Sequence, residues 1–329
     1  MKPIMPLVSA LMVLSGCGSG TVSQDSQGQP KSTFKVALLT PGPVSDAGWS
    51  AMAYNGLMEI KAKMGAEVNN QQCTDAQIRD AMRSYAQQGY DLIIGHGFEY
   101  NAPGVEVAKV FPKTVFVSSS GGDSAPNAGA FRFQLEEGFY LAGLAAGSMT
   151  KSGTVAMIGG PQVPSIQSTF KAFKAGAESA RPGIKVIETF TGKNDDIAAA
   201  NQATLQALNQ GADFVIHQAN AAAQGVFDAC KSKGALAFGA NANQNENGSG
   251  IVLGSAVIIA KPAFLTLAER VKSGDYKGGV ESFGMSSGAI DFVWNPALES
   301  KVPPAVLEGV ARAKEDIKAG KLKVPIDQF

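Results

Sequence analysis

The chain has few of the residues on which metal sites and disulfide frameworks depend. Its 329 residues include three cysteines and two histidines. His96 and His217 have no metal-ligand spacing to a second ligand, so we expect no metal site. Cys73 and Cys230 lie far apart in the sequence, which favours single thiols, with a disulfide in an oxidising compartment as the alternative.

An excess of charge of one sign is also missing. Lys and Arg together number 28, as do Asp and Glu, so the formal net charge is zero. Nucleic-acid-binding proteins usually carry a basic excess or stripe, and we therefore expect no nucleic-acid partner. The N-terminal apolar run, residues 4–14, is shorter than the roughly 20 residues that a membrane-spanning helix needs.

The motifs of the common nucleotide-dependent and hydrolytic enzymes are absent. No G-x-G-x-x-G follows the first predicted strand, and the chain has no Walker A loop and no G-x-S-x-G elbow. A lone histidine at a strand end is more often a packing or hydrogen-bonding residue than a base. We expect no enzyme and no cofactor; a hydrolase on a doubly wound fold is the alternative from another class.

The N-terminus has the pattern of a secreted lipoprotein. Lys2 precedes the apolar run, and "LSGC" resembles a bacterial lipobox, so residues 1–17 are predicted to be a signal peptide that ends at a lipidated Cys17. A plain signal peptide with a chance cysteine is the alternative. Residues 18–33 are small and polar and are predicted to form a flexible tether.

From Phe34 onward, short apolar runs alternate with runs of helical period, which indicates a parallel α/β fold. The length favours two lobes. We assign residues 34–133 and about 256–290 to the first lobe, and 134–255 and about 291–329 to the second. A weak repeat supports similar lobes, because "QQGYDLIIGHG" parallels "NQGADFVIHQA".

Ligands of open parallel sheets bind beyond the carboxyl ends of the strands. The candidate site therefore consists of residues that follow predicted strands: Asp46, Trp49, Phe98, Tyr100, Ser120, Gln162, His217 and Asn241. Asp46 is as suited to capping the next helix as to touching a ligand. This set is aromatic and amide-rich with few charges, which suits a flat, neutral, hydrogen-bonding ligand.

Several blocks carry a resemblance to one family. They are "PGPVSDAGWSAMAYNGL", "AKVFPKTVFV", "EEGFYLAGLAAGSMTKSGTVAMIGG", "FKAGAESARPGIKV", "GADFVIHQANAAAQGVFDACK" and "AFGANANQ". They resemble the basic membrane protein (BMP) family, substrate-binding lipoproteins of ABC transporters that are related to purine nucleoside receptors. The resemblance implies a type I periplasmic-binding fold, in which two Rossmann-like, doubly wound lobes close on a ligand in the cleft between them.

The resemblance also implies partners and a location. We expect a small-molecule ligand, ABC permease and ATPase subunits, and a monomer held at the extracytoplasmic, periplasmic face of the cell membrane by its lipid anchor alone. In the family, the aromatic residue after the first-strand turn stacks on a nucleobase, and Trp49 stands at that position. The alternative role for Trp49 is to pack the first helix onto the sheet.

The chain departs from the nucleoside-binding branch at three positions. Asn241 and Ile258 stand at, and Ser120 near, positions where that branch carries charged residues that grip ribose hydroxyls. The resemblance therefore implies a purine base or a nucleoside-like heterocycle as ligand, with the base preferred. A receptor for another flat ligand such as riboflavin, and a sensor without a transport role, are the alternatives.

Overall fold

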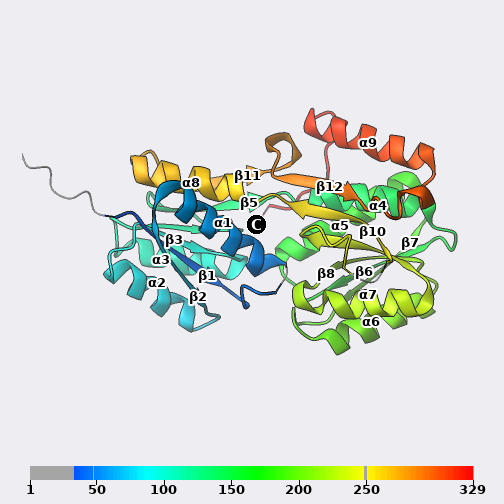
Figure 1. Cartoon of the computed structure of the whole chain (residues 1–329), viewed down its shortest axis with the longest axis horizontal. Coiled ribbons are helices and arrows are strands. Elements are labelled where there is room, and N and C mark those ends of the chain that lie inside the picture. The colour runs from blue at the N-terminus through cyan, green and yellow to red at the C-terminus, as the bar shows by residue number, and fades with distance from the viewer. Residues whose placement is uncertain (1–32, 47, 248–249, 329) are drawn as a thin grey trace, which may run out of the picture. The chain divides into compact units, whose positions relative to one another are not determined.

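The structure is a computed structural model that describes residues 33–46, 48–247 and 250–328. The predicted signal peptide, Cys17 and the tether up to residue 32 lie outside the described residues. From Thr33 onward the chain forms one compact unit that contains two sheets (Figure 1).

The first sheet has the strand order β11-β5-β4-β3-β1-β2, and every neighbouring pair is parallel. β1, β3 and β4 are buried almost throughout, as expected for parallel strands covered on both faces. The strands are β1 (Lys35–Thr40), β2 (Glu67–Gln72), β3 (Leu92–Gly95), β4 (Val115–Ser118), β5 (Ala128–Phe133) and β11 (Gly279–Phe283).

The second sheet has the order β12-β10-β9-β8-β6-β7, and only β12 runs antiparallel to its neighbour. Its strands are β6 (Thr154–Gly159), β7 (Lys185–Phe190), β8 (Phe214–Gln218), β9 (Leu236–Asn241), β10 (Val252–Ile258) and β12 (Ile290–Trp294). β10 runs to Ile258, so the predicted lobe boundary at about residue 256 falls inside a strand of this sheet.

The two sheets repeat one topology. In each, the first strand lies between the second and the third, and the fourth and fifth follow outward. The chain therefore reverses direction across the sheet between β1 and β3, and again between β6 and β8. Such switch points are where doubly wound sheets bind ligands. β3 and β8 occupy equivalent places, which accounts for the weak sequence repeat.

The helices cover the faces of the sheets. They are α1 (Trp49–Met64), α2 (Gln77–Gln87), α3 (Asn101–Ala108), α4 (Glu136–Met149), α5 (Pro164–Ala180), α6 (Ile197–Asn209), α7 (Ala223–Lys233), α8 (Lys261–Ser273) and α9 (Pro304–Lys318). The described residues also form short 3-10 turns: η1 (Phe98–Tyr100), η2 (Asn220–Ala222), η3 (Met285–Ser287) and η4 (Glu299–Lys301).

Glycines allow α4 and α5 to pack closely. A Cβ atom on Gly143 would lie 2.0 Å from the carbonyl oxygen of Phe173, and one on Gly176 would lie 2.1 Å from that of Tyr140. No real Cβ approaches a backbone atom so closely, so larger residues at either position would force the helices apart.

Both described cysteines, Cys73 and Cys230, are free and buried. Burial raises the pKa of the Cys230 thiol to about 12, which keeps it protonated and unreactive. The prediction that Cys73 and Cys230 are single thiols is therefore confirmed, and the alternative of a disulfide between them is wrong. Within the described ranges, no helix is long and apolar enough to cross a membrane.

Candidate functional site

A cavity of about 740 Å³ lies at the carboxyl ends of the strands of both sheets. Its wall includes residues at the ends of, or after, strands β1 to β5 of the first sheet and β6 to β10 of the second. Five of the eight predicted site residues line this cavity: Asp46, Trp49, Phe98, Ser120 and Asn241. The volume is in the range of small-molecule sites.

The turn between β1 and α1 is fixed by Asp46. One carboxylate oxygen accepts hydrogen bonds from the main-chain N–H groups of Gly48 (3.0 Å) and Ala51 (2.9 Å), and the other accepts from Ser50 (2.9 Å). The carboxylate thus satisfies donors at the start of the helix that have no partner within it. Of the two roles open to Asp46, these contacts support capping, and the turn it fixes places Trp49 at the first position of the helix.

Trp49 is half-buried, and one face of its indole lies on the ring of His96. The ring centroids are 3.9 Å apart and the planes differ by 22°. The indole Nε1–H donates to the carbonyl oxygen of His96 (3.1 Å), which fixes the ring orientation. Since Trp49 also lines the cavity, it presents a rigid aromatic wall that is backed by a second ring.

His96 supports this wall from within the protein and is itself completely buried. Its Nε2 lies 2.9 Å from the carbonyl oxygen of Trp49, and its Nδ1 lies 2.6 Å from Ser119 Oγ. Burial lowers the pKa of His96 to about 3, so the imidazole is neutral at physiological pH. A neutral ring with both nitrogens in hydrogen bonds positions Trp49 and has no free site for acid–base chemistry.

Three amides meet on the wall that the second sheet contributes. Asn241 Nδ2 donates to Gln218 Oε1 (2.9 Å) and to Asn220 Oδ1 (3.2 Å). Asn241 is 2% exposed, and its Oδ1 is a buried acceptor with no hydrogen-bond partner among the described residues. Asn194 Oδ1, on the loop after β7, is another such acceptor. Buried polar atoms are normally paired, so these oxygens are candidates to accept from a ligand.

Three predicted site residues do not line the cavity. Tyr100 is wholly buried, and its hydroxyl donates to the carbonyl oxygen of Cys73 (2.5 Å). His217 is wholly buried, with Nε2 2.8 Å from Gln244 Oε1 and burial lowering its pKa to about 4. Gln162 is exposed beside the lining residues Pro161 and Val163. A strand-end position brings a residue to the correct edge but does not fix the direction of its side chain.

The structure adds lining residues that sequence reasoning missed. Carboxylates come from Asp75, Glu99 and Asp195, and a buried ion pair comes from Arg132 and Glu136. Every one of them is on a loop after a strand or at a strand or helix end, which is the signal that could have found them. They make the cavity more acidic than the predicted lining.

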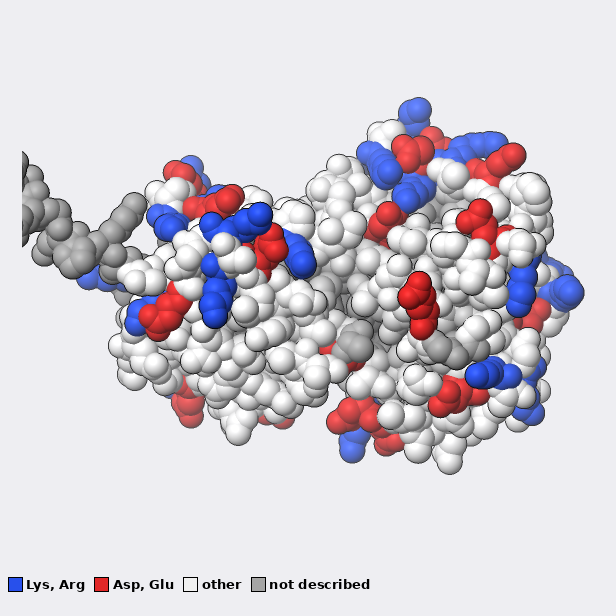
Figure 2. All heavy atoms as spheres, in the orientation of Figure 1, with Lys and Arg blue, Asp and Glu red and all other residues white. Residues whose placement is uncertain are grey.

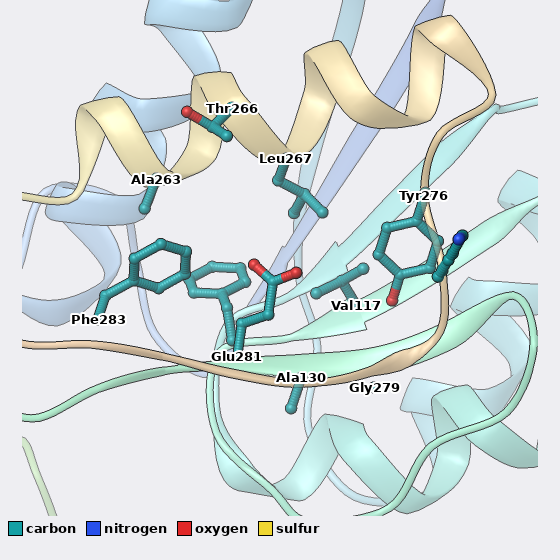
Figure 3. Close-up of a pocket in the computed structure, with 11 residues that line it drawn as sticks. Val117, Ala130, Ala263, Thr266, Leu267, Tyr276, Gly279, Glu281 and Phe283 are labelled. Atoms are coloured by element: carbon teal, nitrogen blue, oxygen red, sulfur yellow. The ribbon is translucent and has the colours of Figure 1, made fainter. Parts of the chain in front are cut away.

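A second, small cavity lies away from this site, between α8 and strands β5 and β11 (Figure 3). It holds about 20 Å³, which is room for about one water molecule. Its lining is mainly apolar, with Thr266, Tyr276, Lys277 and Glu281 as polar neighbours, and it is too small for an organic ligand. Within the described part of the chain, no three His, Cys, Asp or Glu side chains gather as a metal site.

Figure 2 shows Lys and Arg interspersed with Asp and Glu on the visible face, consistent with the balanced composition. A family described as ABC transporter substrate-binding protein, PnrA-like, matches residues 33–325. The chain belongs to this family, Bmp. A Bmp protein is a solute-binding component of an ABC transporter, with a small-molecule ligand and permease and ATPase partners, and it is not an enzyme.

Relatives with diverse names match nearly the whole chain. The transcriptional activator protein med of Bacillus subtilis is 27% identical, covering 88% of each chain. The nucleoside-binding protein BmpA of Lactococcus lactis is 29% identical, covering 97% of this chain and 96% of its own. A purine-binding protein of Brucella abortus is 27% identical, covering 88% and 82%.

The fold is that of known solute-binding proteins. A solute-binding protein from Aeropyrum pernix, 19% identical, superposes with a TM-score of 0.81 over 90% of this chain and 94% of its own. The type I periplasmic-binding fold predicted from the sequence is therefore confirmed.

Proposed function

We propose that this Bmp protein is a lipid-anchored extracytoplasmic receptor that delivers a purine base, or a nucleoside-like heterocycle, to an ABC importer. The observation that carries the proposal is the aromatic wall of the cavity. Trp49 is held flat against His96 and lines the cavity, where a planar ligand could stack on it. Stacking of a base on an aromatic side chain contributes about 1–3 kcal/mol.

The polar lining supports a ligand that donates hydrogen bonds. Asn241 Oδ1 and Asn194 Oδ1 have no hydrogen-bond partner among the described residues, and purine bases carry ring N–H and exocyclic amine donors. Two relatives are named for nucleoside and purine binding, which supports the same class. The lipid anchor rests on "LSGC" and Cys17 in the sequence.

The cavity lining at Ile258, Ser120 and Asn241 favours binding of the free base over its nucleoside. Ile258 lines the cavity and is largely buried, so it offers no partner to a sugar hydroxyl. A hydroxyl left unsatisfied there would cost about 1–3 kcal/mol. Ser120 and Asn241 also line the cavity, without the charge that would strengthen a bond to a hydroxyl. Glu99 and Asp75 are carboxylates in the lining that would bind ribose hydroxyls and favour the nucleoside, if a ribose reached them. Comparing the affinities of base and nucleoside therefore tests which effect is larger.

The experiment is calorimetric titration of ligand-free protein with adenine, guanine, hypoxanthine, their ribonucleosides and riboflavin. We expect each base that binds to have about tenfold or more higher affinity than its nucleoside. This difference corresponds to the free-energy cost of one unsatisfied hydroxyl of the ribose. Nucleosides that bind more tightly than bases would reverse the assignment. Binding of riboflavin alone would reject purines. Native mass spectrometry of the freshly purified protein identifies a ligand carried through purification.

A specific observation favours one second candidate. The relative from Bacillus subtilis is named a transcriptional activator, although it covers 88% of this chain. A sensor that shares the cavity but serves no importer fits that name. Uptake of radiolabelled adenine by cells with and without the gene separates the candidates, because a sensor's deletion leaves uptake unchanged.

A further inference from the structure

The end of β5 carries an arginine that is buried in the wall of the ligand cavity. Arg132 is 5% exposed and forms an ion pair with Glu136, in the first turn of α4, which is 2% exposed. Ser168, on α5, donates to the same Glu136 oxygen (2.6 Å) and lies 3.4 Å from Arg132 Nη2. The pair thus joins a strand of the first sheet to two helices that follow it in the chain.

The C-terminal segment completes this cluster. The main-chain N–H of Asp327 donates to Ser168 Oγ (3.0 Å), and the Asp327 carbonyl oxygen accepts from Arg132 Nη1. Figure 1 marks the C-terminal end beside β5, in agreement with the contact to Arg132. We call Arg132, Glu136, Ser168 and the main chain of Asp327 the Arg132 node.

The side chain of Asp327 has a different, superficial contact. It pairs with Lys171 Nζ at 2.6 Å, and both side chains are substantially exposed. Exposed ion pairs contribute about 0–1 kcal/mol. The main chain of Asp327 and its side chain therefore serve separable purposes.

The node adjoins a second tie between the sheets. Glu137, next to Glu136, accepts from the main-chain N–H of Met285, in the segment that leads from β11 in the first sheet to β12 in the second. The N–H of Gln134 donates to the carbonyl oxygen of Phe283 (2.9 Å) at the start of the same segment. Two segments in which the chain crosses from the first sheet to the second, one after β5 and one after β11, are therefore joined beside the Arg132 node.

We propose that the C-terminal segment is a strap that positions Arg132 and Glu136 in the cavity wall and fixes the crossings between the two sheets. A buried charge is stable only while its hydrogen-bonding partners stay in place, so removing the strap frees the Arg132 side chain and the crossings it holds. The region that matches the Bmp family ends at residue 325, before Asp327.

The test compares three variants of the mature protein. The first lacks residues 326–329. Ser168→Ala removes the hydroxyl at the centre of the node and serves if the truncated chain fails to fold. Asp327→Ala is the matched control, because it keeps the main-chain N–H and carbonyl of the strap and loses only the ion pair with Lys171.

Hydrogen exchange of residues 133–137 and 283–287 is the first readout, with β3 and β8 as internal references. We expect exchange about tenfold faster at both crossings in the truncated chain and in Ser168→Ala, with the reference strands unchanged and Asp327→Ala within twofold of the parent. Adenine affinity, measured by calorimetry, should fall about tenfold if only a tenth of molecules retain the binding geometry.

Each result bears on the strap. Unchanged exchange at the crossings in both the truncated chain and Ser168→Ala overturns it. An effect of Asp327→Ala equal to that of truncation overturns it too, because the surface ion pair would then account for the result. The affinity readout rests on the proposed function; if the parent binds no purine, that function fails, while the exchange data still decide the strap.

Discussion

Replacing Trp49 tests the aromatic wall most directly. The change Trp49→Ala removes the indole that lies on His96 and the Nε1–H bond that orients it. Stacking on a base is worth about 1–3 kcal/mol, so ligand affinity should fall roughly tenfold to a hundredfold. Trp49→Phe keeps an aromatic face but loses the orienting hydrogen bond, and it should weaken binding less.

The chain offers a spectroscopic assay, because it has only two tryptophans. Trp294, on β12, packs edge-on against Phe292 and is not among the cavity-lining residues. A base that stacks on Trp49 should change its fluorescence. We expect the ligand-induced change to persist in Trp294→Phe and to vanish in Trp49→Phe, while calorimetry supplies the affinities of all three proteins.

Two results would refute the stacking role. One is equal ligand affinity for Trp49→Ala and the parent, with thermal unfolding showing that the variant is folded. The other is a fluorescence change that survives in Trp49→Phe and is lost in Trp294→Phe. Either would leave Trp49 as a residue that packs α1 against His96.

Three further predictions follow from burial, packing and the N-terminal pattern. His217 has a pKa of about 4 in the folded protein against 6.5 when unperturbed, so below pH 6.5 the unfolded state binds more protons. Urea titrations should show stability falling with decreasing pH from 6.5 to 4.5, and His217→Gln should reduce that loss by about 2–3 kcal/mol; parallel pH curves would contradict this. Gly143→Ala should destabilise the protein by about 1–3 kcal/mol or more, because the added Cβ meets the Phe173 carbonyl. Gly309→Ala on α9 is the control: its Cβ meets nothing within 4 Å, and it should stabilise the protein by about 0.5–1 kcal/mol in the same denaturation assay. Cys17→Ser should release the protein from the membrane fraction, and retention with unchanged mass would reject the lipobox.

The alternation of strands and helices could be predicted from the sequence because it depends on local signals. Apolar runs such as "YDLIIG" and helix-ending glycines such as Gly65, which has a φ of 63°, act within a few residues. The sequence does not predict β2, because "EVNNQQ" is polar and lacks the apolar run of a buried strand. β2 is an edge strand that forms by pairing with β1, and its own residues do not reveal that pairing.

The candidate site was predictable to the level of the sheet edge. Phe98 and Tyr100 lie two residues apart in the turn η1, yet Phe98 lines the cavity and Tyr100 points into the core toward Cys73. Only tertiary packing decides between these directions. The acidic lining was missed for the same reason, since Asp75 follows the unpredicted strand β2.

The turn "GPVSDAGWS" shows how one local device serves both folding and binding. Asp46 occupies its carboxylate with three main-chain donors, which starts α1 at a fixed point and leaves little capacity for a ligand. That fixed start gives Trp49 its place against His96, whose ring is neutral because it is buried beside Trp49 of α1 and Phe264 of α8. Loss of Asp46 should therefore act on ligand affinity through the position of the indole, and Asp46→Asn, which keeps one acceptor oxygen, should impair binding less than Asp46→Ala. Calorimetry with adenine checks the order, and an Asp46→Ala variant that binds as tightly as the parent would show that the turn holds its shape without the cap.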